Sequence, residues 1–159
     1  MTAHLFLPDE AALVRLAQVA AHSIPDAPQP LVVYLEGDLG TGKTTFARAL
    51  LRALGETGPV RSPTYNLLAE YPTPVGRVLH LDLYRIREPA ELEQLGLGDH
   101  LAGTRLWLIE WPERAEGRLP ASDIRLRLAV KDSGRSVDLF PTSEAGGRWV
   151  GAISGGQTS

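Results

Sequence analysis

The chain has 159 residues, a net charge of −3 and a pI near 5.8, and it contains no cysteine. This length favours one compact domain, and the lack of cysteine excludes disulfides, zinc–cysteine sites and thiol catalysis. The acidic balance is not that of a protein that binds nucleic acid directly. Without a signal-peptide pattern or an apolar run long enough to span a membrane, we expect a cytoplasmic protein with neither membrane nor DNA as a partner.

The first half of the chain predicts a helix, a buried strand and a second helix. Asp9 is a typical N-cap residue, and apolar residues recur on one helical face after it. Residues 31–35 form a continuous apolar, β-branched run, which predicts a buried strand. A second amphipathic helix is expected from about Thr44, with Gly55 as its C-cap.

Two antiparallel hairpins are predicted in the second half. Residues 64–71 and 77–84 have strand character and flank a turn rich in proline and glycine. Residues 124–130 and 135–140 alternate in polarity around an Asp-Ser-Gly turn.

A short helix over residues 89–95 and a buried strand over residues 105–110 separate the two hairpins. We therefore expect a single α/β domain over residues 1–150, whose central mixed sheet combines parallel strands with antiparallel hairpins and is flanked by helices. Residues 151–159 are rich in glycine and serine, and we expect them to form a disordered tail.

The strongest functional signal is the segment 37–44, which matches the P-loop pattern G-x-x-x-x-G-K-[ST]. In such a loop the backbone N–H groups point inward and form a nest for an anion, and glycines let the backbone approach the phosphates. The next helix adds the positive end of its dipole. We expect Lys43 to reach the β- and γ-phosphates and Thr44 to ligate Mg²⁺. The residues expected to hold the nucleotide here are Asp38, Leu39, Gly40, Thr41, Gly42, Lys43, Thr44 and Thr45.

Two carboxylates end apolar strands on the side of the sheet where the loop should lie. Glu110 ends the strand 105–110, and Asp82 ends another apolar run. Carboxylates at the carboxyl ends of strands suit Mg²⁺, so we predict that both act at a magnesium site, although solvated strand-end acids are the alternative. Thr64 occupies the position of a switch that senses a γ-phosphate, but a turn that starts a strand explains it equally well. Trp111 is either a core residue or a residue that packs on the nucleotide.

The nucleotide is expected to be ATP. GTPases that resemble Ras read guanine with an Asn-Lys-x-Asp segment, whereas Asn66 is the only asparagine of this chain and is followed by Leu67. A P-loop kinase for a small molecule stays open as an alternative, with Arg85 and Arg87 as a candidate lid. A scaffold that binds ATP without hydrolysing it is the third possibility.

Several segments, taken in order, resemble the TsaE family, formerly called YjeE. The similarity extends from about residue 8 to residue 135. The segments that carry it are 37–45, 61–65, 80–85, 91–96 and 109–112. The resemblance implies a P-loop α/β fold with antiparallel strands in its sheet. It also implies a bacterial ATPase that is required to make N6-threonylcarbamoyladenosine next to the tRNA anticodon. Such a protein works with the TsaB–TsaD complex, and through that complex indirectly on tRNA.

The resemblance also assigns roles to individual residues. It places Mg²⁺ on Thr44 and Glu110, makes Asp82 a Walker-B-like acid, and makes Thr64 a switch residue. Trp111 would lie beside the site. Together with Lys43, the residues Asp82, Glu110 and Thr64 would form the catalytic set, and the further nucleotide contacts would be Glu10 and Arg135. Because no segment clearly supplies both a water-orienting group and an arginine for the γ-phosphate, we expect slow hydrolysis in the absence of partners.

Overall fold

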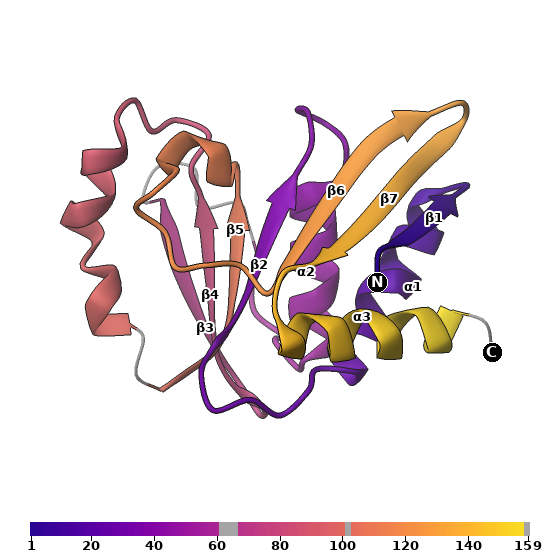
Figure 1. Cartoon of the computed structure of the whole chain (residues 1–159), viewed down its shortest axis with the longest axis horizontal. Helices are drawn as coiled ribbons and strands as arrows, with labels where there is room; N and C mark the ends of the chain where they lie inside the picture. Colours follow the sequence, from indigo (N-terminus) through magenta and orange to yellow (C-terminus); the bar gives the residue numbers. More distant parts are fainter. Residues whose placement is uncertain (61–66, 101–102, 158–159) are drawn as a thin grey trace.

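The computed structural model describes residues 1–60, 67–100 and 103–157 (Figure 1). The strands are β1 (Ala3–Leu7), β2 (Leu31–Glu36), β3 (Leu68–Thr73), β4 (Gly76–Asp82), β5 (Thr104–Glu110), β6 (Ile124–Lys131) and β7 (Gly134–Pro141). The α-helices are α1 (Glu10–His22), α2 (Lys43–Ala53) and α3 (Glu144–Gln157), and the 3-10 helices are η1 (Pro89–Leu95), η2 (Leu97–His100) and η3 (Pro112–Ala115).

All seven strands form one mixed sheet in the order β1-β7-β6-β2-β5-β4-β3. Its centre is parallel, because β2 pairs in parallel with both β5 and β6, and β4 pairs in parallel with β5. The two predicted hairpins are confirmed as the antiparallel pairs β3–β4 and β6–β7. Residues 64–66, which we also expected in a strand, lie outside the described residues. The sheet therefore confirms the expected mixed α/β architecture.

The two faces of the sheet carry two separate cores. Alternate residues of β2 enter different cores: Leu31, Val33 and Leu35 belong to the larger one, and Val32 belongs to the smaller one. Helices α1, α2 and α3 complete the larger core, whereas η1 and η3 contribute to the smaller. Burial on both faces explains why this strand is apolar without alternation.

Helix α1 begins where the sequence predicts. The Asp9 carboxylate accepts a hydrogen bond from the backbone N–H of Ala12 at 2.8 Å, which caps the first turn. Helix α2 begins at Lys43, directly after the segment 37–42, and buries the stripe that begins with Phe46 and Ala47. The junction of β2, the loop and α2 is thus the strand–loop–helix unit that a P-loop requires.

Helix α3 corrects the expectation for the C-terminal segment. We predicted disorder from residue 151, but α3 continues through Gln157. Trp149, Val150 and Ile153 are buried in the larger core, and the Trp149 indole N–H donates to the Ala20 carbonyl at 3.0 Å. Because the segment is rich in glycine, its helix propensity is low, and packing against α1 stabilises it instead. Residues 158–159 lie outside the described part of the chain.

Strand β1 is a second element that the sequence did not predict. It pairs antiparallel with β7, so that Leu7 lies opposite Arg135. This pairing brings the N-terminal segment beside the last hairpin (Figure 1). Within the described residues, none of the helices has both the length and the apolar character needed to cross a membrane.

Candidate functional site

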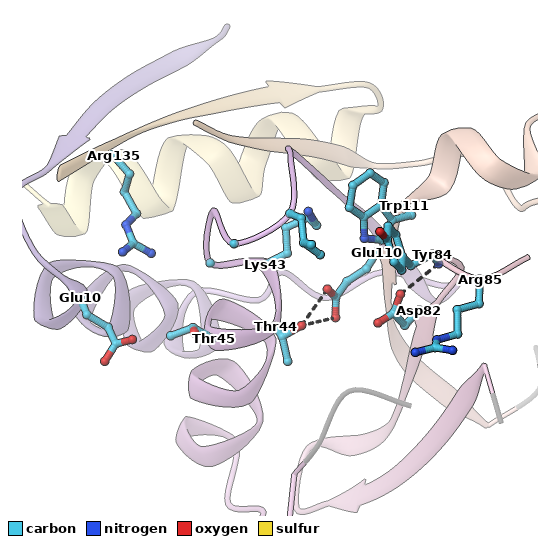
Figure 2. Close-up of a pocket in the computed structure, with 13 residues that line it drawn as sticks. Glu10, Lys43, Thr44, Thr45, Asp82, Tyr84, Arg85, Glu110, Trp111 and Arg135 are labelled. Carbon is cyan, nitrogen blue, oxygen red and sulfur yellow. Dashed lines mark hydrogen bonds between the residues drawn. The ribbon is translucent and has the colours of Figure 1, made fainter. Parts of the chain in front are cut away.

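The candidate site is a cleft of about 440 Å³ at the carboxyl ends of the parallel strands (Figure 2). Strand β2 leads into the loop, and strands β4 and β5 end at Asp82 and Glu110. Ligands in open α/β sheets bind at this edge. The sequence-predicted residues that line the cleft are Glu10, Leu39, Gly40, Gly42, Lys43, Thr44, Thr45, Asp82, Glu110, Trp111 and Arg135.

Two predicted residues with described positions, Asp38 and Thr41, are not part of this lining. The backbone carbonyl of Asp38 accepts hydrogen bonds from Thr41 and Lys43, and Asp38 lines a neighbouring hollow instead of the cleft. Thr41 is buried, and its hydroxyl donates to the Asp38 carbonyl at 2.9 Å. Thr64 lies outside the described residues. The structure therefore assigns Asp38 and Thr41 to the internal framework of the loop, while the role of Thr64 stays a prediction.

Two glycines let the loop fit closely against the sheet. Gly37 has φ 142° and Gly42 has φ 114°, in the left-handed region that disfavours side chains. A Cβ atom on Gly37 would lie 2.4 Å from the carbonyl oxygen of Leu128. A Cβ atom on Gly42 would lie 2.4 Å from a guanidinium nitrogen of Arg135. Leu128 of β6 and Arg135 of β7 thus pack closely against the loop, which leaves no room for a side chain at either glycine.

Lys43 begins α2 and is buried against the loop. Its ammonium donates to the carbonyl oxygens of Gly37 at 2.5 Å and Asp38 at 2.9 Å. It also lies 4.1 Å from the centre of the Trp111 ring. Burial lowers the pKa of Lys43 from its ordinary value, and the negative charge of Glu110 partly opposes this shift. The site therefore contains a cation at the first turn of a helix, where both the charge and the helix dipole attract anions.

The hydroxyl of Thr44 faces the carboxylate of Glu110. It donates at 2.9 Å to one carboxylate oxygen and at 3.1 Å to the other (Figure 2). Glu110 is only 2% exposed. Asp82 lies opposite Glu110 in the β4–β5 register, so the two acids lie side by side. The Asp82 carboxylate accepts a hydrogen bond from the backbone N–H of Tyr84 at 3.1 Å.

This arrangement fits a magnesium ion that is bound together with a phosphate ligand. No group of three or more His, Cys, Asp or Glu side chains that could hold a metal is present among the residues with described positions. Magnesium in nucleotide sites needs only one or two protein ligands, because phosphate and water oxygens complete its octahedron. The adjacent oxygens of Thr44 and Glu110 are hard donors of this kind.

Trp111 follows Glu110 with a strained backbone. Its φ of 59° is left-handed, which is rare for a bulky residue. The ring packs on Tyr84 at a centroid distance of 4.9 Å and on the ammonium of Lys43. Strain of this kind concentrates at ligand sites. Of the two interpretations of Trp111, its partial exposure and its place in the cleft favour the site over the core.

Glu10 and Arg135 approach the loop from distant parts of the sequence. Arg135 lies on β7, and its guanidinium donates to the Thr41 carbonyl at 3.1 Å. Glu10 begins α1. Figure 2 shows both on one side of Lys43, whereas Tyr84, Arg85 and Trp111 lie on the other side.

Sequence reasoning missed two features of the site. Tyr84 lines the cleft, and its place two residues after Asp82 was the available signal. His80 is fully buried, and its Nε2 lies 2.6 Å from a carboxylate oxygen of Glu110. The sequence could have indicated this position through strand alternation, which puts His80 and Asp82 on the same face of β4.

Known proteins share both the sequence and the fold of this chain. The family model of the threonylcarbamoyl adenosine biosynthesis protein TsaE matches residues 7–137. The tRNA threonylcarbamoyladenosine biosynthesis protein TsaE of Haemophilus influenzae is 36% identical over 151 residues, which are 94% of this chain and 96% of that protein. The protein of the same name from Bacillus subtilis is 37% identical over 118 residues, which are 74% of this chain and 72% of that protein.

A solved structure extends this likeness to the fold. The crystal structure of YdiB from Bacillus subtilis has a TM-score of 0.76 and 25% sequence identity, and the similarity covers 99% of this chain and 97% of that chain. The resemblance seen in the sequence is thereby confirmed. The chain belongs to the TsaE family, which takes part in the biosynthesis of threonylcarbamoyladenosine in tRNA.

Proposed function

We propose that this chain is a magnesium-dependent P-loop ATPase required for the N6-threonylcarbamoyladenosine modification of tRNA. The observation that carries the proposal is the contact between Thr44 and Glu110, made at the N-terminus of the helix that follows the glycine loop. A hydroxyl and a carboxylate placed together at this point are the protein ligands that a magnesium–nucleotide complex needs.

The proposal gives each of the predicted site residues a separate role. The N–H groups of the loop hold the phosphates, and Lys43 donates to the β- and γ-phosphate oxygens. Thr44 and Glu110 would hold magnesium, whose charge would offset the negative charge that develops on the phosphates. Asp82 lies beside Glu110 and would accept hydrogen bonds from the water ligands of the ion. Thr64 is proposed as the switch that responds to the γ-phosphate.

The remaining cleft residues support the nucleotide from two sides. Glu10 and Arg135 approach the loop from α1 and β7, and Trp111 covers the loop beside Lys43. We take ATP rather than GTP as the nucleotide, because the chain lacks the Asn-Lys-x-Asp segment with which Ras-like GTPases read guanine.

The proposed partner is the TsaB–TsaD complex, in the cytoplasm. Two named relatives are tRNA threonylcarbamoyladenosine biosynthesis proteins, which supports a role in the same pathway. A net charge of −3 disfavours direct binding of tRNA. The chain would therefore reach tRNA only through its protein partners.

The test combines binding, product analysis and reconstitution. Calorimetry should show ATP binding that strengthens with magnesium, and chromatography should show ADP and phosphate as the products. Incubation with ATP and a cell extract should give no new phosphorylated metabolite, whereas a small-molecule kinase would form one. Modified tRNA should appear when the chain is added to TsaB–TsaD together with the threonylcarbamoyl donor. A chain that binds no ATP, or that the modification does not need, would overturn the proposal.

A further inference from the structure

His80 is a polar residue in an apolar setting. It lies on β4 and is 0% exposed. Opposite it in the parallel β4–β5 ladder is Leu108, and the neighbouring position of its own strand on the same face is Val78. Both belong to the larger core. A buried imidazole is unfavourable unless its nitrogens find partners, so its presence at this position needs an explanation.

The register of the sheet explains why His80 contacts Glu110. Directly opposite residues in a ladder share one face, and residues two apart on a strand share it as well. Leu108 and Glu110 are two apart on β5, so His80 and Glu110 lie on the same face. The side chain of His80 therefore points along the sheet toward the Glu110 carboxylate, one step deeper in the core than Asp82.

The contact with Glu110 involves one particular nitrogen of His80. Carboxylate oxygens accept hydrogen bonds, so in this contact the Nε2 of His80 is the donor to Glu110 Oε2 at 2.6 Å. The other nitrogen, Nδ1, is buried without a hydrogen-bond partner in the part of the chain that the structure describes. His80 thus makes a single directed bond there, which is the bond to Glu110.

The bonds to Glu110 come from two different elements, α2 and β4. Thr44, on α2, donates to the carboxylate from the cleft side. His80 donates from the interior of the sheet. Because Glu110 is only 2% exposed, surrounding water contributes little to its orientation. Oε2 therefore contacts both His80, at 2.6 Å, and the Thr44 hydroxyl, at 3.1 Å, whereas Oε1 lies 2.9 Å from the same hydroxyl, so the bond from His80 fixes the carboxylate as it faces Thr44.

We propose that His80 is a positioning residue, which orients the Glu110 carboxylate as a ligand for the magnesium ion that accompanies ATP. This inference rests on the proposed function, because it concerns the same metal site. Outer partners of metal-binding carboxylates fix the ligand geometry, and their loss lowers metal affinity or activity roughly 10- to 100-fold. Because His80 is 0% exposed and does not line the cleft, it would itself touch neither nucleotide nor metal.

The experiment measures the magnesium dependence of ATP binding, without relying on turnover. His80→Leu removes the donor and keeps an apolar core, whereas His80→Gln keeps an amide donor at a similar reach. The matched control is His100→Leu, since His100 also pairs with a glutamate, Glu70, and lies outside the cleft. Circular dichroism and thermal unfolding check the fold of all three variants.

The half-saturating magnesium concentration for ATP binding should rise roughly 10- to 100-fold in His80→Leu. It should stay near the wild-type value in His80→Gln and in His100→Leu. ATP affinity measured in EDTA should be the same in all proteins.

Three outcomes would overturn the inference. An unchanged magnesium requirement in His80→Leu would show that Glu110 needs no such support. If His80→Leu lost ATP affinity equally in magnesium and in EDTA, His80 would have a purely structural role. Unfolding of both His80 variants would lead to the same conclusion. If wild-type protein binds ATP but ignores magnesium, the metal site of the proposed function fails as well, which separates this result from a failure of His80 alone.

Discussion

The ammonium of Lys43 lies 4.1 Å from the centre of the Trp111 ring and donates to two carbonyl groups of its own loop. The two residues are 68 positions apart in the chain, and β5 brings them together beside β2. The aromatic face and the carbonyl dipoles both attract the cation. The ammonium is therefore held within the loop, where a phosphate group would bind.

Lys43→Ala should weaken ATP binding and leave the fold intact. A hydrogen bond to a charged group contributes about 1.5–3 kcal/mol, so we expect a loss of affinity of about 10- to 100-fold or more. The only other lysine of the chain, Lys131, is exposed at the end of β6 and gives a matched control as Lys131→Ala. Calorimetry on both folded variants measures the effect. If Lys43→Ala binds ATP as well as Lys131→Ala does, the phosphate role of this lysine is wrong.

Glu110→Gln and Asp82→Asn should each impair the magnesium-dependent step more than the fold. Both changes keep the shape of the side chain and remove the negative charge that a hard cation requires. ATP binding in EDTA should persist, whereas the gain in affinity on adding magnesium and the rate of hydrolysis should fall about 10-fold or more in each variant. The exposed acid Glu116 serves as the control, as Glu116→Gln. Full hydrolysis and full tRNA modification by both site variants would contradict the metal assignment.

The sequence predicted the elements whose signals are local. The loop 37–44 has a fixed pattern, β2 is a continuous apolar run, and the hairpins have recognisable turn residues. The structure adds what depends on long-range contacts. Arg135 reaches the carbonyl of Thr41 only because β7 passes beside the loop, and residue patterns without the family resemblance did not reveal this contact.

Helix α3 was missed for a related reason. Its glycines lower the helix propensity of the segment, and the residues that stabilise it, such as Trp149, act through contacts with α1 more than a hundred positions away. His80 was missed because a histidine within a strand has no motif of its own. Its meaning depends on the register between β4 and β5, which a single sequence does not specify.

Two adjacent glycines of α3 should respond oppositely to substitution by alanine. A Cβ atom on Gly146 would lie 1.8 Å from the carbonyl oxygen of Asp123, so Gly146→Ala should destabilise the fold by about 1–3 kcal/mol through overpacking. A Cβ atom on Gly147 would meet no described atom within 4 Å. Gly147→Ala should therefore stabilise the helix by about 0.5–1 kcal/mol. Urea unfolding of the two variants gives both values, and equal midpoints would contradict the packing of α3 against the loop that contains Asp123.

ATP hydrolysis should be slow in the isolated chain and faster with the TsaB–TsaD complex. Fast phosphoryl transfer needs a group that orients the attacking water and a cation on the γ-phosphate. Among the described residues that line the cleft there is no glutamine, and both of its arginines are already engaged: Arg135 donates to the loop at Thr41, and Arg85 has an interaction within the chain. A docking partner would complete the site beside Tyr84 and Trp111, which line the cleft, and Tyr84 is exposed.

Coupling of this kind requires that the ATP and ADP forms bind the partner with different affinities. Hydrolysis is compared for the chain alone and with TsaB–TsaD, and Lys43→Ala in the complex serves as the control for contaminating ATPase. Binding to TsaB–TsaD is then measured with a non-hydrolysable ATP analogue and with ADP. We expect a higher rate in the complex and unequal affinities for the two nucleotide forms. Equal rates together with equal affinities would describe an ATPase that works independently of its partners, because a nucleotide that leaves partner affinity unchanged cannot shift the state of the complex.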